Sequence, residues 1–363
     1  MGKAKLWKLV GILGLIVGLA AIPFTTCAAP APAPMKLTLA HVEPPGSVPA
    51  QFVKWWANEV EKRTSGEVVI TIYGAGTLAT HKEMLEATTK GTIDIGYTTW
   101  LTHFANNFPI HQMKVGAVAF RNKSLALWMA GDAIEEEIPE MRTSWQANKL
   151  MRLFSHGVAS VHLLSKKPIR TLEDAKGLKV RASGILNTTL LQAIDAVVVN
   201  IPSAEAFDAL QKGVIQGTVC DISWAARFKF PEVAKCFTHV GFGGDPTLSF
   251  AMNLEVWNKL SPKIQKVFLD LRTESLKVYA EMLKKDIQTG AFETFKKGNV
   301  EIIDLPAADI ERWKSFPNVK NLGENWVKWG LKNAKIAEPR LREILQRYIS
   351  LIEEMEKRYP ESW

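Results

Sequence analysis

The first two thirds of the chain alternate strand-like and helix-like hydrophobic patterns. Leu37, Leu39 and His41 share one face of a period-two stretch, as in a half-buried β-strand. Strands are predicted over 36–42, 68–73, 92–97, 161–165, 178–182, 197–201 and 214–219, and helices over 49–63, 80–90, 184–194 and 203–212. Strands and helices in alternation predict an α/β fold with parallel strand pairs.

From residue 261 the pattern changes to long amphipathic helices. Ser261 and Pro262 are a typical N-cap and first-turn pair. A helix from there to about residue 297 would be roughly 55 Å long, enough to lie across two lobes. The last helix carries a sustained apolar stripe of Leu341, Ile344, Leu345, Tyr348, Leu351, Ile352 and Met355. This stripe indicates packing within the chain, with a dimer surface as the alternative to a monomer.

The N-terminal segment is typical of an exported protein. Basic residues precede an apolar run over 9–22, which is short for a membrane span but suits a secretory signal. Cys27 and an Ala/Pro-rich stretch follow, so residues 1–34 are interpreted as signal peptide and tether. We expect a periplasmic protein. Cys27 is a candidate for lipid attachment, and cleavage without a lipid is the alternative.

Composition and charge exclude several classes. The chain of 363 residues is 47% hydrophobic with a formal net charge of +8, and no dense Lys/Arg run is interleaved with aromatic residues. This argues against nucleic-acid binding, whereas mild basicity suits an anionic ligand. Outside the leader, Cys220 and Cys236 allow either a disulfide or two free buried thiols.

The enzyme-like motifs are weak. Residues 74–79 form a Gly-rich turn between a strand and a helix, and Asp94 follows at the distance seen in dinucleotide-binding folds. The predicted helix is short and Asp94 sits within a strand, so we expect no cofactor. Nucleophile-elbow and zinc-protease motifs are missing from the sequence, and we expect neither a metal nor enzymatic activity.

Three residues stand where a ligand would bind. Arg181 ends the strand that leads to it, and its guanidinium group is suited to a bidentate contact with a carboxylate. Such a bond contributes roughly 1.5–3 kcal/mol, a fraction of the roughly 8 kcal/mol of micromolar binding. Trp100 and Trp224 also follow predicted strands, and ligands of open α/β sheets bind beyond the carboxyl ends of strands. For Arg181 the alternative is a surface or interlobe salt bridge.

An ordered set of segments resembles a known family. The segments are Leu37–His41, Glu59–Gly66, Gly91–Gly96, Lys167–Ile169, Leu172–Arg181, Ala209–Ile215 and Phe250–Asn253, followed by Trp257. In this order they resemble the DctP-type dicarboxylate-binding family, the solute-binding proteins of tripartite ATP-independent periplasmic (TRAP) transporters. The similarity extends over residues 36–330.

The resemblance implies a two-lobed periplasmic-binding clamshell with a long helix spanning both lobes. We expect lobe I to hold residues 36–158 and about 247–290, and lobe II to hold 159–246 and about 291–363 with the C-terminal helices. It also implies a small organic acid held by Arg181 and delivered to the small and large TRAP membrane subunits. A binding protein of another importer or a periplasmic ligand sensor is the alternative; an enzyme is a more distant one.

Other site residues follow from the resemblance and its departures. Cys220 stands where relatives often have an asparagine that contacts the ligand, and Asp221 beside it offers an acceptor for a ligand hydroxyl or amine. His41 is expected to line the mouth of the site, and Phe250 and Asn253 to lie near the crossover between lobes. Because these polar neighbours differ from the family pattern, the sequence does not name the acid.

Overall fold

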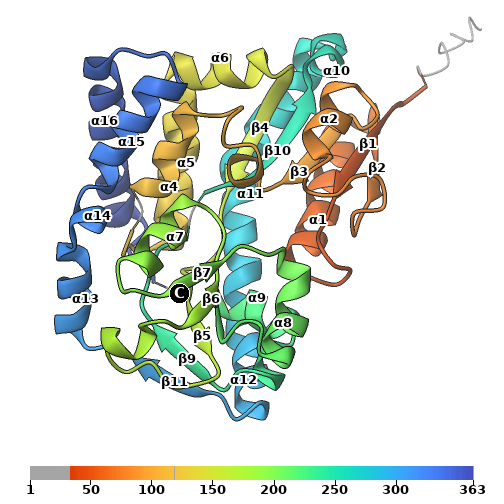
Figure 1. Cartoon of the computed structure of the whole chain (residues 1–363). Coiled ribbons are helices and arrows are strands. Elements are labelled where there is room, and N and C mark those ends of the chain that lie inside the picture. The colour runs from red at the N-terminus through yellow and green to blue at the C-terminus, as the bar shows by residue number, and fades with distance from the viewer. Residues whose placement is uncertain (1–32, 118, 245, 363) are drawn as a thin grey trace, which may run out of the picture. The chain divides into compact units, whose positions relative to one another are not determined.

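The structure is a computed structural model, and it describes residues 33–117, 119–244 and 246–362 (Figure 1). The predicted signal peptide and Cys27 lie outside these residues. Two separate β-sheets, each with its own helices, organise the chain from residue 34 onward. The predicted α/β class is confirmed.

The first sheet has the strand order β2-β1-β3-β10-β4. Its strands are β1 (Met35–His41), β2 (Val68–Tyr73), β3 (Ile95–Thr98), β4 (Leu150–His156) and β10 (Leu248–Asn253). Strand β1 lies parallel to β2 and β3, whereas β10 is antiparallel to β3 and β4. The β-branched run Val68–Ile72 explains why β2 follows its predicted bounds.

The second sheet has the order β11-β9-β5-β8-β6-β7. Its strands are β5 (His162–Ser165), β6 (Lys179–Arg181), β7 (Val197–Val199), β8 (Gly217–Cys220), β9 (Cys236–His239) and β11 (Glu301–Asp304). Strand β6 is parallel to β7 and β8, while β5 is antiparallel to β8 and β9.

Two of the chain segments that connect the sheets are hydrogen-bonded to each other. The chain leaves the first sheet after β4 and returns after β9; Val161 N donates to Gly243 O over 3.2 Å, and Phe242 N donates to Val161 O over 3.0 Å. Gly244 is required here, because a Cβ atom on it would lie 2.2 Å from the carbonyl oxygen of Val158. The crossovers therefore form a paired connection between the two sheets.

Helices cover both sheets. They are α1 (Val48–Arg63), α2 (Met84–Thr89), α3 (Trp100–His103), α4 (Met113–Gly116), α5 (Ser124–Glu137), α6 (Pro139–Ala147), α7 (Ile185–Gln192), α8 (Ala206–Lys212), α9 (Ile222–Arg227), α10 (Leu254–Lys259), α11 (Pro262–Asp286), α12 (Phe292–Lys297), α13 (Ala307–Ser315), α14 (Pro317–Lys320), α15 (Leu322–Asn333) and α16 (Glu338–Arg358). Short 3₁₀ turns lie at Ile110–Gln112, Leu172–Ala175, Ser203–Glu205 and Phe230–Glu232. On α1, Phe52, Trp56 and Val60 are spaced four residues apart on one face, and all three are fully buried.

The long helix predicted after Ser261 is present and passes from one sheet to the other (Figure 1). Helix α11 continues through a π-helical turn, η5 (Ile287–Ala291), directly into α12. Helix α11 packs on α1, α5 and β4 of the first sheet, whereas η5 and α12 pack on α9 of the second. Ser261 caps the start through its side chain, which accepts from Ile264 N.

The C-terminal helix α16 packs on α5 beside the first sheet. Ion pairs of 2.7 Å join Arg340 to Glu140 and Arg347 to Glu137. The apolar stripe of α16 is thus covered within the chain. None of the helices in the described part of the chain is long and apolar enough to cross a membrane.

Candidate functional site

Arg181 is the last residue of β6 and is almost completely buried, with 4% of its surface exposed. Its Nε donates to Ile201 O over 3.1 Å, and its Nη2 donates to Ser203 Oγ over 3.1 Å. Burial lowers the pKa of Arg181 to about 10, which leaves the guanidinium charged at neutral pH. In the described part of the chain no carboxylate forms an ion pair with it. A buried charge without a counter-ion is costly, so this arginine is suited to receive an anion.

Helix α9 supplies the surroundings of Arg181. Strand β6 pairs with β8, and the chain runs from β8 into α9 through Asp221. The Asp221 carboxylate caps the helix by accepting from Trp224 N over 2.8 Å. The Trp224 ring lies under Arg181, with the guanidinium carbon 5.0 Å from the ring centroid. The structure therefore brings Arg181, Trp224 and Asp221 together.

Within the described residues Asp221 forms no ion pair with Arg181 and instead caps α9. Burial raises the pKa of Asp221 to about 6, and the hydrogen bond from Trp224 N and the charge of Arg227 only partly oppose this effect. The Cys220 thiol beside it is also buried, and burial raises its pKa well above the usual value. Cys220 and Cys236 are free; they lie on β8 and β9, which are separated by β5. Of the two alternatives for these cysteines, the structure shows two free thiols.

His41 ends β1 on the first sheet and is buried. Its Nδ1 accepts from Glu43 N over 3.1 Å, and burial lowers the pKa of the ring. The turn after β2 passes close to the imidazole, because a Cβ atom on Gly74 would lie 2.8 Å from His41 Cε1. The glycine turn that resembled a nucleotide-binding loop therefore packs against His41.

Three predicted site residues are packed or hydrogen-bonded within the first sheet and its helices. Trp100 is fully buried and donates its indole N–H to Ser249 O over 2.9 Å. Phe250 packs in an aromatic cluster with its ring 4.8 Å from that of Trp56. Asn253 caps α10 and donates to Thr88 O over 2.9 Å. The polar groups of Trp100 and Asn253 are already satisfied within the first sheet and its helices, and no hydrogen bond, ion pair or ring contact joins any of the three residues to Arg181 in the described chain.

Comparison with known proteins decides the family. A model described as "Bacterial extracellular solute-binding protein, family 7" matches residues 39–319. The chain belongs to this family. The predicted DctP-type TRAP membership is thereby confirmed, and the family consists of binding proteins that serve transporters.

Named relatives of this solute-binding protein extend over most of its length. A solute-binding protein of Albidiferax ferrireducens is 26% identical, covering 83% of this chain and 89% of its own. The C4-dicarboxylate-binding periplasmic protein DctP of Rhodobacter capsulatus is 23% identical, covering 84% and 90%. A TRAP periplasmic solute-binding protein of Desulfovibrio salexigens has a similar structure, with a TM-score of 0.76, 26% identity, and coverage of 90% and 97%.

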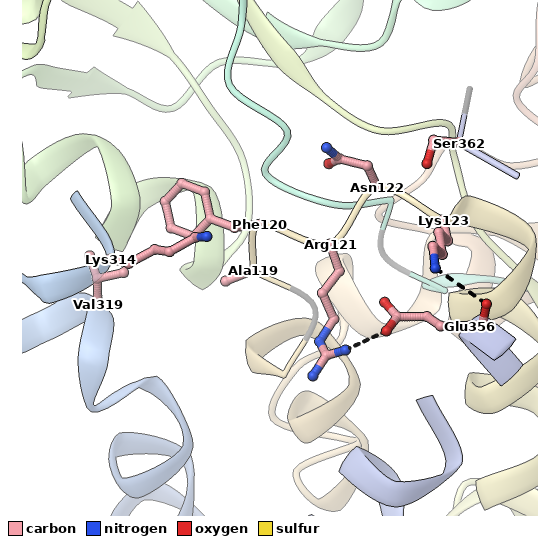
Figure 2. A pocket seen from close by; sticks show the side chains of 9 residues that line it. All are labelled: Ala119, Phe120, Arg121, Asn122, Lys123, Lys314, Val319, Glu356 and Ser362. Carbon is pink, nitrogen blue, oxygen red and sulfur yellow. Dashed lines mark hydrogen bonds and ion pairs between the residues drawn. The ribbon is translucent and has the colours of Figure 1, made fainter. Parts of the chain in front are cut away.

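A cavity of about 540 Å³ lies elsewhere in this solute-binding protein. Figure 2 shows its basic lining from the segment before α5 and from the C-terminal helices. Arg121 pairs with Glu356 over 2.8 Å, and Lys314 lies over the Phe120 ring. These cations already have partners, and none of the predicted ligand residues lines the cavity.

Sequence reasoning missed two charged residues near the predicted site. Glu43 follows β1 and Arg227 ends α9, and they form an ion pair of 3.8 Å that joins the first-sheet side to the second-sheet side. Glu43 stands two residues beyond His41, and Arg227 one helical turn beyond Trp224. Their positions close to His41 and Trp224 in the sequence could have indicated that they belong to the site.

Proposed function

We propose that this solute-binding protein captures a small organic carboxylate with Arg181 and delivers it to TRAP membrane subunits outside the cytoplasm. The observation that carries the proposal is the buried guanidinium of Arg181, which has no carboxylate partner in the described chain. Ligand carboxylate oxygens would supply the missing negative charge. Trp224 and Asp221 would contact the bound acid from α9, next to Arg181, and His41 would contact it from the end of β1.

The relatives support a carboxylate. Structures of similar fold include TRAP solute-binding proteins in complex with 3-hydroxybenzoate, with 20% identity and a TM-score of 0.77, and with mandelate, with 20% identity and a TM-score of 0.76. All of these ligands are carboxylic acids that differ in the rest of the molecule. We therefore infer the class of ligand rather than a single acid.

Binding would be coupled to movement of the two sheets. Arg181, Asp221 and His41 are each about 4% exposed, so a ligand needs an opening to reach them. A ligand that contacts both sides stabilises the closed arrangement and shifts the population towards it. The membrane subunits would then recognise the closed form.

The proposal is tested by removing the charge of Arg181. Arg181→Met keeps the apolar stem, and we expect it to weaken binding of the preferred acid by at least about tenfold, which equals about 1.4 kcal/mol. Calorimetric titration after a thermal-shift screen of organic acids, on protein refolded without ligand, measures the change. Arg170→Met is the matched control, because Arg170 is exposed and pairs with Glu301. Unchanged titration of Arg181→Met would refute the assignment.

A further inference from the structure

Glu43 and Arg227 face each other at a distance too long for a direct hydrogen bond. The Oε2 atom of Glu43 lies 3.8 Å from Nη1 of Arg227, longer than a hydrogen bond between these groups. Only 14% of the Glu43 side chain and 22% of the Arg227 side chain are exposed. The two groups are therefore mostly removed from water without binding each other directly.

Neither charged group has a side-chain hydrogen bond within the described residues, although the Arg227 guanidinium carbon lies 5.5 Å from the Phe228 ring centroid. The Nε atom of Arg227 is buried and has no hydrogen-bond partner. Within the described residues, no hydrogen bond reaches the Glu43 carboxylate, and burial raises its pKa although Arg227 opposes this effect. Buried polar groups in proteins are nearly always hydrogen-bonded, so the unpaired Nε of Arg227 beside the Glu43 carboxylate indicates that something else completes the pair.

The pair lies next to the carboxylate site. Arg227 follows Trp224 by three residues on α9, so the two side chains project from the same face of the helix. The Trp224 ring contacts Arg181, and Asp221 at the start of the helix is close enough to Arg227 for their charges to interact. An acid held by Arg181 would therefore extend along α9 towards Arg227 and Glu43.

The chemistry of the pair selects one kind of ligand group. A hydroxyl both donates and accepts hydrogen bonds, so it can donate to the Glu43 carboxylate and accept from the Arg227 guanidinium. A second carboxylate would bind Arg227 but be repelled by Glu43, an ammonium group would bind Glu43 but be repelled by Arg227, and an alkyl group would leave both without a hydrogen bond. We propose that the bound solute is a hydroxy acid, whose hydroxyl is recognised between Glu43 and Arg227. This inference rests on the proposed binding of a carboxylate by Arg181.

The test compares matched acids that differ by one hydroxyl. Mandelate with phenylacetate, 3-hydroxybenzoate with benzoate, and lactate with propionate are titrated into the wild type, Glu43→Gln and Arg227→Gln. We expect the wild type to bind the hydroxy acid of at least one pair about tenfold or more tightly, equal to about 1.4 kcal/mol. Both variants should reduce this ratio to about threefold or less while changing the affinity for the matching deoxy acid by less than about threefold.

The alternatives give different results. Equal weakening of both acids of a pair would show that Glu43 and Arg227 only hold the two sides together, and it would overturn hydroxyl recognition. Preference of the wild type for the deoxy acids would overturn it as well. If Arg181→Met binds every acid like the wild type, the proposed carboxylate site itself fails, whatever the ratios are. Arg227→Gln keeps the test valid if Glu43→Gln does not fold, as checked by circular dichroism.

Discussion

Two buried arginines of this protein have opposite surroundings. Arg152 on β4 and Arg181 on β6 are both about 4% exposed. Arg152 is paired with Asp132 and Glu136, and its Nε lies 3.7 Å from Glu135. Burial acts to lower the pKa of Arg152, but these carboxylates outweigh it and raise the pKa, whereas burial lowers the pKa of Arg181.

Burial alone therefore does not distinguish an arginine that stabilises the fold from one that is available to a ligand. A buried arginine with carboxylates around it completes an internal network. A buried arginine that contacts only a carbonyl, a hydroxyl and an aromatic ring keeps its charge available to a bound ligand. Each of the following variants alters either the network around Arg152 or the surroundings of Arg181.

The largest effect is expected from Arg152→Met. It would leave the buried carboxylate of Asp132 without its cation and remove a longer contact to Glu135, and removing one partner of a buried pair typically costs about 3–5 kcal/mol. Urea unfolding of the ligand-free protein measures the loss in the free energy of unfolding. A loss below about 1 kcal/mol would mean that the network around Arg152 is dispensable for folding.

A pH-dependent effect is expected from Asp221→Asn. The pKa of Asp221 is raised from 3.8 to about 6, so the folded protein binds this proton more tightly than the unfolded chain. Asp221 therefore lowers stability progressively as the pH rises through that window. Asn keeps the cap on Trp224 N but removes the titration, so the stability of the variant relative to wild type should rise between pH 4 and 7. The gain is up to about 3 kcal/mol.

Urea unfolding at several pH values checks this expectation. Glu43, whose pKa is also raised, is present in both proteins and cancels in the difference. Asp270→Asn is the control, because Asp270 is an exposed carboxylate on α11. A pH-independent difference would show that Asp221 does not titrate in this range.

A smaller effect on binding is expected from Trp224→Leu. It removes the ring under the Arg181 guanidinium, an interaction worth about 0.5–2 kcal/mol, and frees the arginine to adopt other rotamers. Acid binding should weaken by about 2- to 30-fold in calorimetric titration. Trp55→Leu on α1 serves as the control. If Trp224→Leu binds as tightly as wild type, the ring does not position Arg181.

The smallest effect is expected on the stability of Arg181→Met without ligand. Two hydrogen bonds to neutral groups and one aromatic contact are lost, but a buried charge is removed as well. The free energy of unfolding should change by less than about 1 kcal/mol. A loss as large as that of Arg152→Met would show that Arg181, like Arg152, mainly stabilises the fold.

Local sequence patterns predicted most of the elements but fewer of the contacts. The strand over 68–73 and the helix after Ser261 follow directly from β-branched residues and from capping. Arg181 was predicted because a strand end and an arginine coincide. Trp100 also follows a strand, yet the side to which its ring turns depends on packing against distant residues such as Trp145. The Glu43–Arg227 pair was beyond prediction, since it depends on how the two sheets meet.

The π-helical turn η5 has a consequence for the spacing of the long helix. Each residue of an α-helix advances the side-chain direction by about 100°. A π turn contains about one residue more than an α turn, so it changes the direction in which the following side chains point. Deleting one residue within Ile287–Ala291 would therefore rotate α12 by about 100° and carry Phe295 away from Phe237, which its ring now meets at 5.1 Å. We therefore expect substitutions in this turn to disturb the packing of α12 less than a change in its length.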